Sequence, residues 1–121
     1  MVATHIVSGK KGEDIASKYL AKNGYKLLTR NFRTRNGEVD IIALDADVLV
    51  FVEVKTRSSE AFGTPFEAIT FWKMRALQRA AEFYKHTHPK LPDAMRIDVV
   101  SVMIDMNGSV LNVEHLKNAT V

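Results

Sequence analysis

The chain has 121 residues, of which 46% are hydrophobic and 26% charged, a size and composition that fit one globular domain with a buried core. It has no cysteine, which excludes disulfides and thiolate metal sites and favours a reducing, cytoplasmic setting, and no apolar run approaches the roughly 18 residues of a membrane-spanning helix. The formal net charge of +3 favours polyanionic partners without identifying one.

The first part of the chain predicts a helix followed by three strands. Apolar residues recur at helical spacing over residues 9–23 and Gly24 supplies a stop, so a helix is expected there, after a flexible N-terminus of residues 1–8. Asn36-Gly37 is the strongest hairpin signal in the chain. Strands rich in alternating or β-branched residues are predicted over residues 25–35, 39–44 and 49–56.

The second part of the chain predicts helical structure and then two strands. Residues 57–63 are expected to form a polar loop, and residues 64–67 a capping box that begins a helix. Helical spacing continues to Tyr84, and Thr70 offers a second start, so one helix or two helices at an angle both fit. The last strands are predicted over residues 96–104 and 110–116. The order αβββαββ indicates a single α/β domain, residues 9–119, with a central mixed sheet flanked by helices.

Charged residues occupy both ends of the central hairpin. If the loop is centred on residues 46–47, Asp40 faces Glu53 and Glu38 faces Lys55, all on one face of the sheet. Directly opposed carboxylates repel each other, and proteins accept such a pair mostly where a cation lies between them. One lysine leaves the group acidic, so a hard cation such as Mg²⁺, which takes oxygen ligands and keeps waters, suits it.

A purely structural alternative also fits these charges. Pairing across the Asn36-Gly37 turn would set Arg35 opposite Glu38 and Arg33 opposite Asp40. The acids would then form an ordinary charged strand end that meets solvent, neutralised by arginines. Spacing alone leaves both interpretations open.

An acid on one strand followed by Glu-x-Lys on the next resembles the active site of the PD-(D/E)XK nuclease superfamily. Here these residues are Asp40 and Glu53-Val54-Lys55. The order of elements matches as well, and residues 9–119 resemble the YraN-like family of small bacterial proteins. Stretches that carry this closer resemblance include Gly12-Glu13, Asn23-Gly24-Tyr25, Gly37-Glu38-Val39-Asp40, Lys73 and Arg96-Ile97-Asp98.

The resemblance implies a restriction-endonuclease-like fold and a Mg²⁺- or Mn²⁺-dependent endonuclease, similar to Holliday junction resolvases. It implies hydrolysis of DNA rather than RNA, with a branched, flapped or single-stranded substrate in repair or recombination, and a homodimer as the working unit. Asp40 and Glu53 would be metal ligands with Glu13 as a further ligand, Lys55 would orient water or counter negative charge, and Glu38 would be an auxiliary acid. Inactive superfamily members make a nucleic-acid-binding module or adaptor the alternative.

Further along the chain, basic and aromatic residues suggest contacts with nucleic acid. Lys73 and Arg79 lie on different sides of the second predicted helix, so the basic residues cannot all line one groove. Phe71-Trp72 could stack on a base, although packing at the helix start is the favoured interpretation. Asp98 could approach the site, but an ion pair with Arg96 or another cation that stabilises the fold is the favoured interpretation. The residues we predict to contact phosphates are Arg33, Arg35, Arg57, Lys73 and Arg79.

Overall fold

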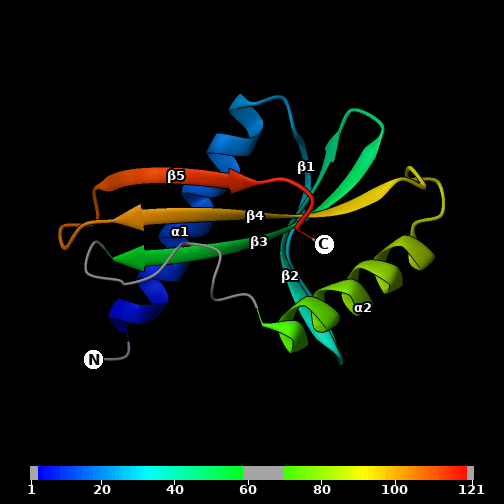
Figure 1. The fold of residues 1–121 in the computed structure, drawn as a ribbon, viewed down its shortest axis with the longest axis horizontal. Coiled ribbons are helices and arrows are strands. Elements are labelled where there is room, and N and C mark those ends of the chain that lie inside the picture. The colour runs from blue at the N-terminus through cyan, green and yellow to red at the C-terminus, as the bar shows by residue number, and fades with distance from the viewer. Residues whose placement is uncertain (1–2, 59–69, 120–121) are drawn as a thin grey trace.

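The computed structural model describes residues 3–58 and 70–119, and their side chains from Gly9 onward. It confirms a single α/β domain with the predicted order of elements (Figure 1). The elements are α1 (Ala3–Lys22), β1 (Lys26–Thr34), β2 (Gly37–Asp45), β3 (Val48–Ser58), α2 (Phe71–Thr87), β4 (Met95–Ile104) and β5 (Val110–Leu116). Among the described helices, none is long and apolar enough to cross a membrane.

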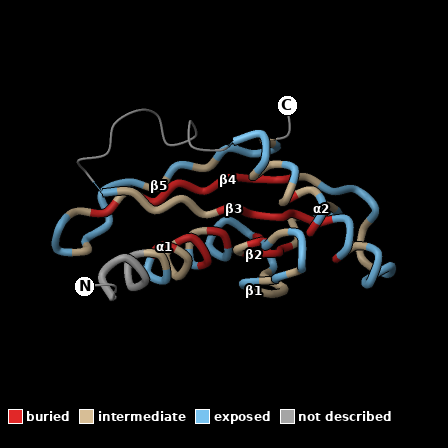
Figure 2. Tube along the Cα trace, turned by 90° about the horizontal axis from the view of Figure 1, so that it is seen from below, coloured by how far each residue is buried: buried red, intermediate tan, exposed pale blue. Residues whose placement is uncertain are grey.

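The five strands form one mixed sheet in the order β1-β2-β3-β4-β5. Only β3 and β4 pair in parallel, as expected of two strands separated by a helix, and the other neighbours are antiparallel. Each helix covers one face of the sheet, so the central strands are buried on both sides (Figure 2). Leu20 anchors the core under α1, and Leu77 and Tyr84 anchor the core under α2.

The register between β2 and β3 agrees with the prediction. Leu44 pairs with Leu49 and Ile42 with Phe51, around the two-residue turn of residues 46–47. The pairing stops after Ile41 and Val52. Beyond that point the two strands separate, and this separation is the feature on which the site depends.

The hairpin between β1 and β2 differs from the prediction. Thr34 pairs with Gly37 and Arg33 with Glu38, so the turn residues are Arg35 and Asn36, and the expected pairs of Arg35 with Glu38 and Arg33 with Asp40 are wrong. The Thr34 hydroxyl accepts from the backbone N–H of Asn36 and of Gly37, and it donates to the Gly37 carbonyl. A hydroxyl that forms these hydrogen bonds with backbone groups favours a turn at residues 35–36, one residue before the predicted turn at residues 36–37.

Gly37 is required by packing rather than by the turn. Its φ is not positive, but a Cβ added there would lie 2.5 Å from the carbonyl oxygen of Ala76 in α2. Replacing Gly37 by alanine is therefore expected to push α2 from β2 and to lower the free energy of unfolding by about 1 to 3 kcal/mol. Urea denaturation measures the loss, with Gly9→Ala in α1 as the control because its Cβ would meet nothing within 4 Å. Equal destabilisation in both variants would contradict this explanation.

Several element boundaries differ from the predicted ones. The first helix begins at Ala3, so residues 3–8, expected to be a flexible N-terminus, continue it. β3 runs to Ser58 and so includes Arg57, which we had placed in a loop. Thr70 does begin a helix: its hydroxyl accepts from the Lys73 N–H at 3.0 Å, a typical N-cap. The capping box of residues 64–67 lies outside the described residues.

Candidate functional site

Asp40 lies where β2 and β3 separate, and its side chain takes the place of the missing backbone ladder. Its Oδ2 accepts a hydrogen bond from the backbone N–H of Val54 at 2.8 Å. Val39, before it, packs under α2, whereas Ile41, after it, packs under α1, so β2 turns over at Asp40. We had predicted that Asp40 pairs with Glu53 across a regular ladder, and it does not. Instead, the backbone amide of Val54, the residue after Glu53, holds the Asp40 side chain.

Glu53 is the most deeply buried acid at this position, with 3% of its surface exposed. Its Oε2 lies 3.5 Å from the Nζ of Lys55 and 3.5 Å from the Nζ of Lys73. Both separations exceed the 2.7–2.9 Å of a short charge-assisted hydrogen bond. Its Oε1 is buried and has no hydrogen-bond partner among the described residues. Within residues 3–58 and 70–119, one oxygen of a buried carboxylate is therefore left without a donor.

The two acids raise each other's energy in the ionised state. Burial, and next the charge of Glu53, raise the pKa of Asp40 to about 7, against an opposing hydrogen bond from the Val54 amide. Glu13 adds to the rise and Lys73 reduces it. Burial and a neighbouring carboxylate both disfavour the ionised form of a carboxyl group, and here they outweigh the nearby cation. We define the acid pair as Asp40 and Glu53.

The residues present fit a hard divalent cation at the acid pair. Among the described residues the Oε1 of Glu53 has no hydrogen-bond donor, and the nearby charge of Glu53 helps to raise the pKa of Asp40, so a cation bound to both carboxylates would relieve both effects. Mg²⁺ is usually held by one or two carboxylates together with waters and substrate phosphate. Within the described residues, however, no three His, Asp or Glu side chains converge closely enough to hold a metal ion. The protein would thus supply two ligands.

Two predicted site residues are not brought into the acid pair. Glu13 in α1 is held by Arg30 of β1, whose NH2 lies 3.5 Å from its Oε1, so it acts on Asp40 only through space. Glu38 is 46% exposed and forms an ion pair with Arg33 across the hairpin, at 3.1 Å from the Arg33 Nε to its Oε2. Its predicted partner Lys55 binds Glu53 instead.

Predicted phosphate-binding residues lie in different places. Arg33, Arg35 and Lys73 line one depression of about 370 Å³. Arg33 also lines a second depression of about 610 Å³, together with Glu13. Arg57 is half-buried on β3, and Arg79 is exposed on α2 outside both depressions. Among the described residues, cations thus outnumber acids in the depression beside the hairpin, which suits a polyanion.

Sequence reasoning missed the contact between Lys73 and Glu53. Lys73 lies twenty residues further along the chain and was expected only to contact nucleic acid. The one sequence signal for this contact was Thr70, because a helix that begins there places Lys73 in its first turn, where the α2 N-cap fixes it.

A second polar group is buried on the α1 side of the sheet, around Asp98. Asp98 is 0% exposed, and its Oδ1 accepts from the Arg96 Nε at 2.9 Å, which confirms the predicted ion pair. His115 Nε2 lies 2.8 Å from Oδ2, and the Tyr25 hydroxyl donates to the same oxygen at 3.2 Å. The backbone N–H of Asn118 also donates to Oδ1. We call these residues the Asp98 network.

Comparison with known proteins places the chain among uncharacterised relatives. The model of "Uncharacterised protein family UPF0102" matches residues 12–102. A UPF0102 protein of Caldicellulosiruptor saccharolyticus is 47% identical over 92% of this chain and 94% of its own length. One from Syntrophomonas wolfei is 45% identical over 92% and 95%, and one from Rhodococcus opacus 42% identical over 98% and 99%. Their names record no activity.

Proposed function

The chain belongs to the uncharacterised protein family UPF0102, the YraN-like family, and from its acid pair we propose that it is a Mg²⁺- or Mn²⁺-dependent nuclease that hydrolyses phosphodiester bonds in DNA. The observation that carries the proposal is the buried, unpartnered Oε1 of Glu53 beside Asp40. Leaving a buried carboxylate oxygen without a partner costs free energy, and such a cost is usually retained where a ligand or ion relieves it.

Each residue at the acid pair has a distinct task in this proposal. Asp40 and Glu53 would hold the ion, which supplies an activated water and offsets charge on the phosphoryl group. The Val54 amide fixes one oxygen of Asp40 and leaves the carboxylate with a single orientation. Lys55 would stabilise the negative charge that develops on the phosphate oxygens. Lys73, whose Nζ lies beside the same Glu53 oxygen as that of Lys55, would attract a phosphate of the DNA strand to the site.

The remaining predicted residues would act further from the reacting phosphate. Arg33 and Arg35 in the hairpin depression would bind the sugar-phosphate backbone, which gives affinity without reading sequence. Arg57 and Arg79 are proposed as outer backbone contacts, and Glu13 as a nearby acid held by Arg30. The substrate would be branched, flapped or single-stranded DNA, and a homodimer would allow the protein to reach two strands.

Metal-dependent cleavage tests this proposal directly. Labelled single-stranded, flapped, four-way-junction and duplex DNA, with a matched RNA, would be incubated with the purified protein in Mg²⁺, Mn²⁺, Ca²⁺ or EDTA. We expect products from at least one DNA in Mg²⁺ or Mn²⁺, none in EDTA, and their loss in Lys55→Ala. Asp93→Asn, at a side chain that is 99% exposed, is the control and should cleave as wild type does. No product from any DNA with either metal would contradict the proposal.

One observation favours a second candidate function, a nucleic-acid-binding module without turnover. Two lysines already neutralise part of the charge on Glu53, and no third acid joins the pair within the described residues. Binding that weakens steeply with salt, without metal-dependent products, would support this alternative, because phosphate contacts release counterions.

A further inference from the structure

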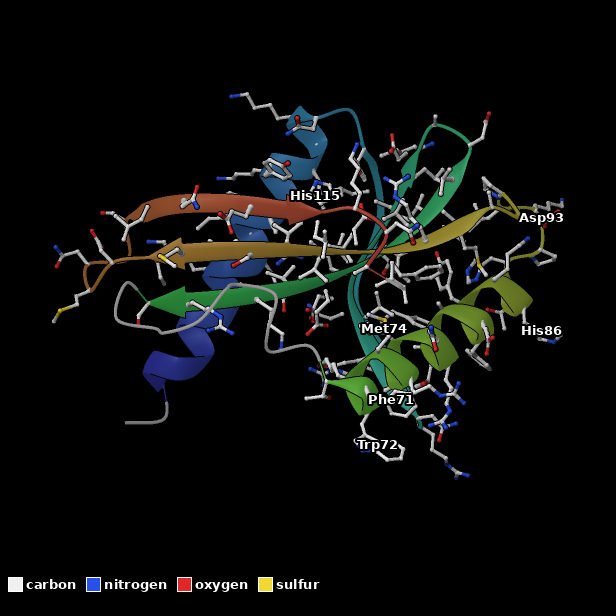
Figure 3. The ribbon with its side chains drawn as sticks, viewed as in Figure 1. Phe71, Trp72, Met74, His86, Asp93 and His115 are labelled. Atoms are coloured by element: carbon white, nitrogen blue, oxygen red, sulfur yellow. The ribbon has the colours of Figure 1, made fainter. Side chains whose placement is uncertain are left out.

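Two aromatic side chains, Phe71 and Trp72, project from the first turn of α2 away from the sheet (Figure 3). Phe71 is 67% exposed and Trp72 is 75% exposed, and they meet edge to face with ring centroids 5.2 Å apart. The sequence favoured packing at the helix start, but the described residues leave both rings largely open. We call this pair the aromatic platform.

The charges around the aromatic platform are opposite to those that a helix start normally carries. The first turn of α2 contains no acidic residue, Lys73 follows Trp72 directly, and the exposed Arg75 lies three residues after Trp72. Because the N-terminal end of a helix already carries partial positive charge, cations there are unfavourable for the helix itself. Glu53 offsets part of the charge of Lys73, and an anion bound beside the platform would offset the charge of the exposed Arg75 and of the helix end.

The residue after the aromatic platform reaches the acid pair. Lys73, the residue after Trp72, brings its Nζ to 3.5 Å from Glu53. The Thr70 cap bonds the Lys73 backbone and so holds this turn in one conformation. A strand whose phosphate binds beside Lys73 would have a neighbouring base within reach of the first turn of α2, which carries Trp72.

We propose that the aromatic platform stacks on unpaired bases and makes this protein bind single-stranded DNA in preference to duplex. The position of the bound DNA strand rests on the proposed function. The platform adds a selection for substrates with unpaired bases. Bases in a duplex are stacked on their neighbours, whereas unpaired bases can offer a face to an aromatic side chain, whatever their sequence. Adjacent cations and the absence of acids in the first turn favour a polyanion over a second protein surface.

The chain offers its own reporter, because Trp72 is its only tryptophan. In EDTA, where cleavage is prevented, an oligothymidine should quench the Trp72 fluorescence in a saturable way, and a blunt duplex of equal length should bind more weakly. Anisotropy of a labelled oligothymidine then measures the variants. Trp72→Ala should bind between about five- and one-hundredfold more weakly, and Trp72→Phe should keep most of the affinity. Met106→Ala, at another exposed apolar side chain, is the matched control and should bind as wild type does.

The inference would be overturned by wild-type affinity in Trp72→Ala, by an unchanged Trp72 emission on binding, or by equal affinity for duplex. A free protein that dimerises with Trp72 shielded from acrylamide would also overturn it and identify a second copy as the occupant. Failure of the proposed function looks different. In that case no metal produces cleavage, although Trp72 is still quenched by single-stranded DNA.

Discussion

Replacing Asp40 by asparagine is expected to abolish metal-dependent cleavage and, in the same protein, to raise the free energy of unfolding at pH 8. The ion at the acid pair would supply several kcal/mol of transition-state stabilisation, so the rate should fall on the order of a thousandfold or more. Asparagine retains an oxygen that can accept from the Val54 amide, so the local geometry survives. The variant therefore separates chemistry from folding.

The gain in stability follows from the direction of the Asp40 pKa shift. Burial and the charge of Glu53 raise the pKa of Asp40 in the folded state to about 7. The contribution of Asp40 to the free energy of unfolding is therefore fully present below its unfolded pKa and is lost as the pH rises through 7. At pH 8 asparagine removes this loss, and we expect a gain of about 1 to 3 kcal/mol, less than the whole shift because Asp40 is only partly buried.

Urea denaturation in EDTA at pH 5 and pH 8 measures this effect. The difference between Asp40→Asn and wild type should appear at pH 8 and shrink at pH 5. Mg²⁺ should then stabilise the wild type, because an ion that binds only the folded state adds free energy by mass action, and should leave Asp40→Asn unchanged. Asp93→Asn, the same chemical change at an exposed position, serves as the control. Retained cleavage, or lower stability at pH 8, would rule out the assigned role of Asp40.

The largest loss of stability is expected from Asp98→Ala, at about 2 to 4 kcal/mol, because the change removes a fully buried carboxylate from His115, Tyr25 and Arg96, of which Arg96 alone keeps another carboxylate, Asp45 at 2.7 Å. A domain of this kind has only about 5 to 15 kcal/mol in total, so the variant should be marginally folded at 37 °C. Asp98→Asn keeps an acceptor for one donor and should lose less. Equilibrium urea unfolding of the three proteins measures these losses. Equal stability of Asp98→Ala and wild type would show that the network is not a structural anchor.

The pH dependence of Asp98 has the opposite sign to that of Asp40. Burial alone would raise its pKa, but hydrogen bonds from Arg96, the Asn118 amide and His115 together hold the pKa below its ordinary value. Its contribution is therefore present above the unfolded pKa and is lost as pH falls through the lower folded pKa. Acid denaturation of the wild type should include this loss, and Asp98→Asn should not show it.

The register of the central hairpin could be predicted from the sequence because neighbouring residues determine it. The turn at residues 46–47 and the apolar run on each side of it fix the register of β2 against β3, and the structure confirms that register. Asp40 and Glu53 were brought together for the same reason. What spacing could not show was that the strands separate at Asp40, because that depends on the twist of β2 between the two helices.

The missed features depend on partners far apart in the chain. Gly37 has the sequence of a turn glycine, but Ala76 of α2 is what requires it. The Thr34 hydroxyl competed with the Asn-Gly signal and shifted the turn. His115 was isolated in the sequence, and only the pairing of β4 with β5 brings it to Asp98. Patterns within one element could not show these contacts.

The hydrogen bond between Val54 and Asp40 has a practical consequence. An amide that is bonded to a carboxylate rather than to a neighbouring strand will change its magnetic environment whenever that carboxylate gains a proton or a cation. The nitrogen-15 resonance of Val54 is therefore an internal probe of the acid pair. It can be followed by NMR of the isotopically labelled protein without a substrate or a reaction.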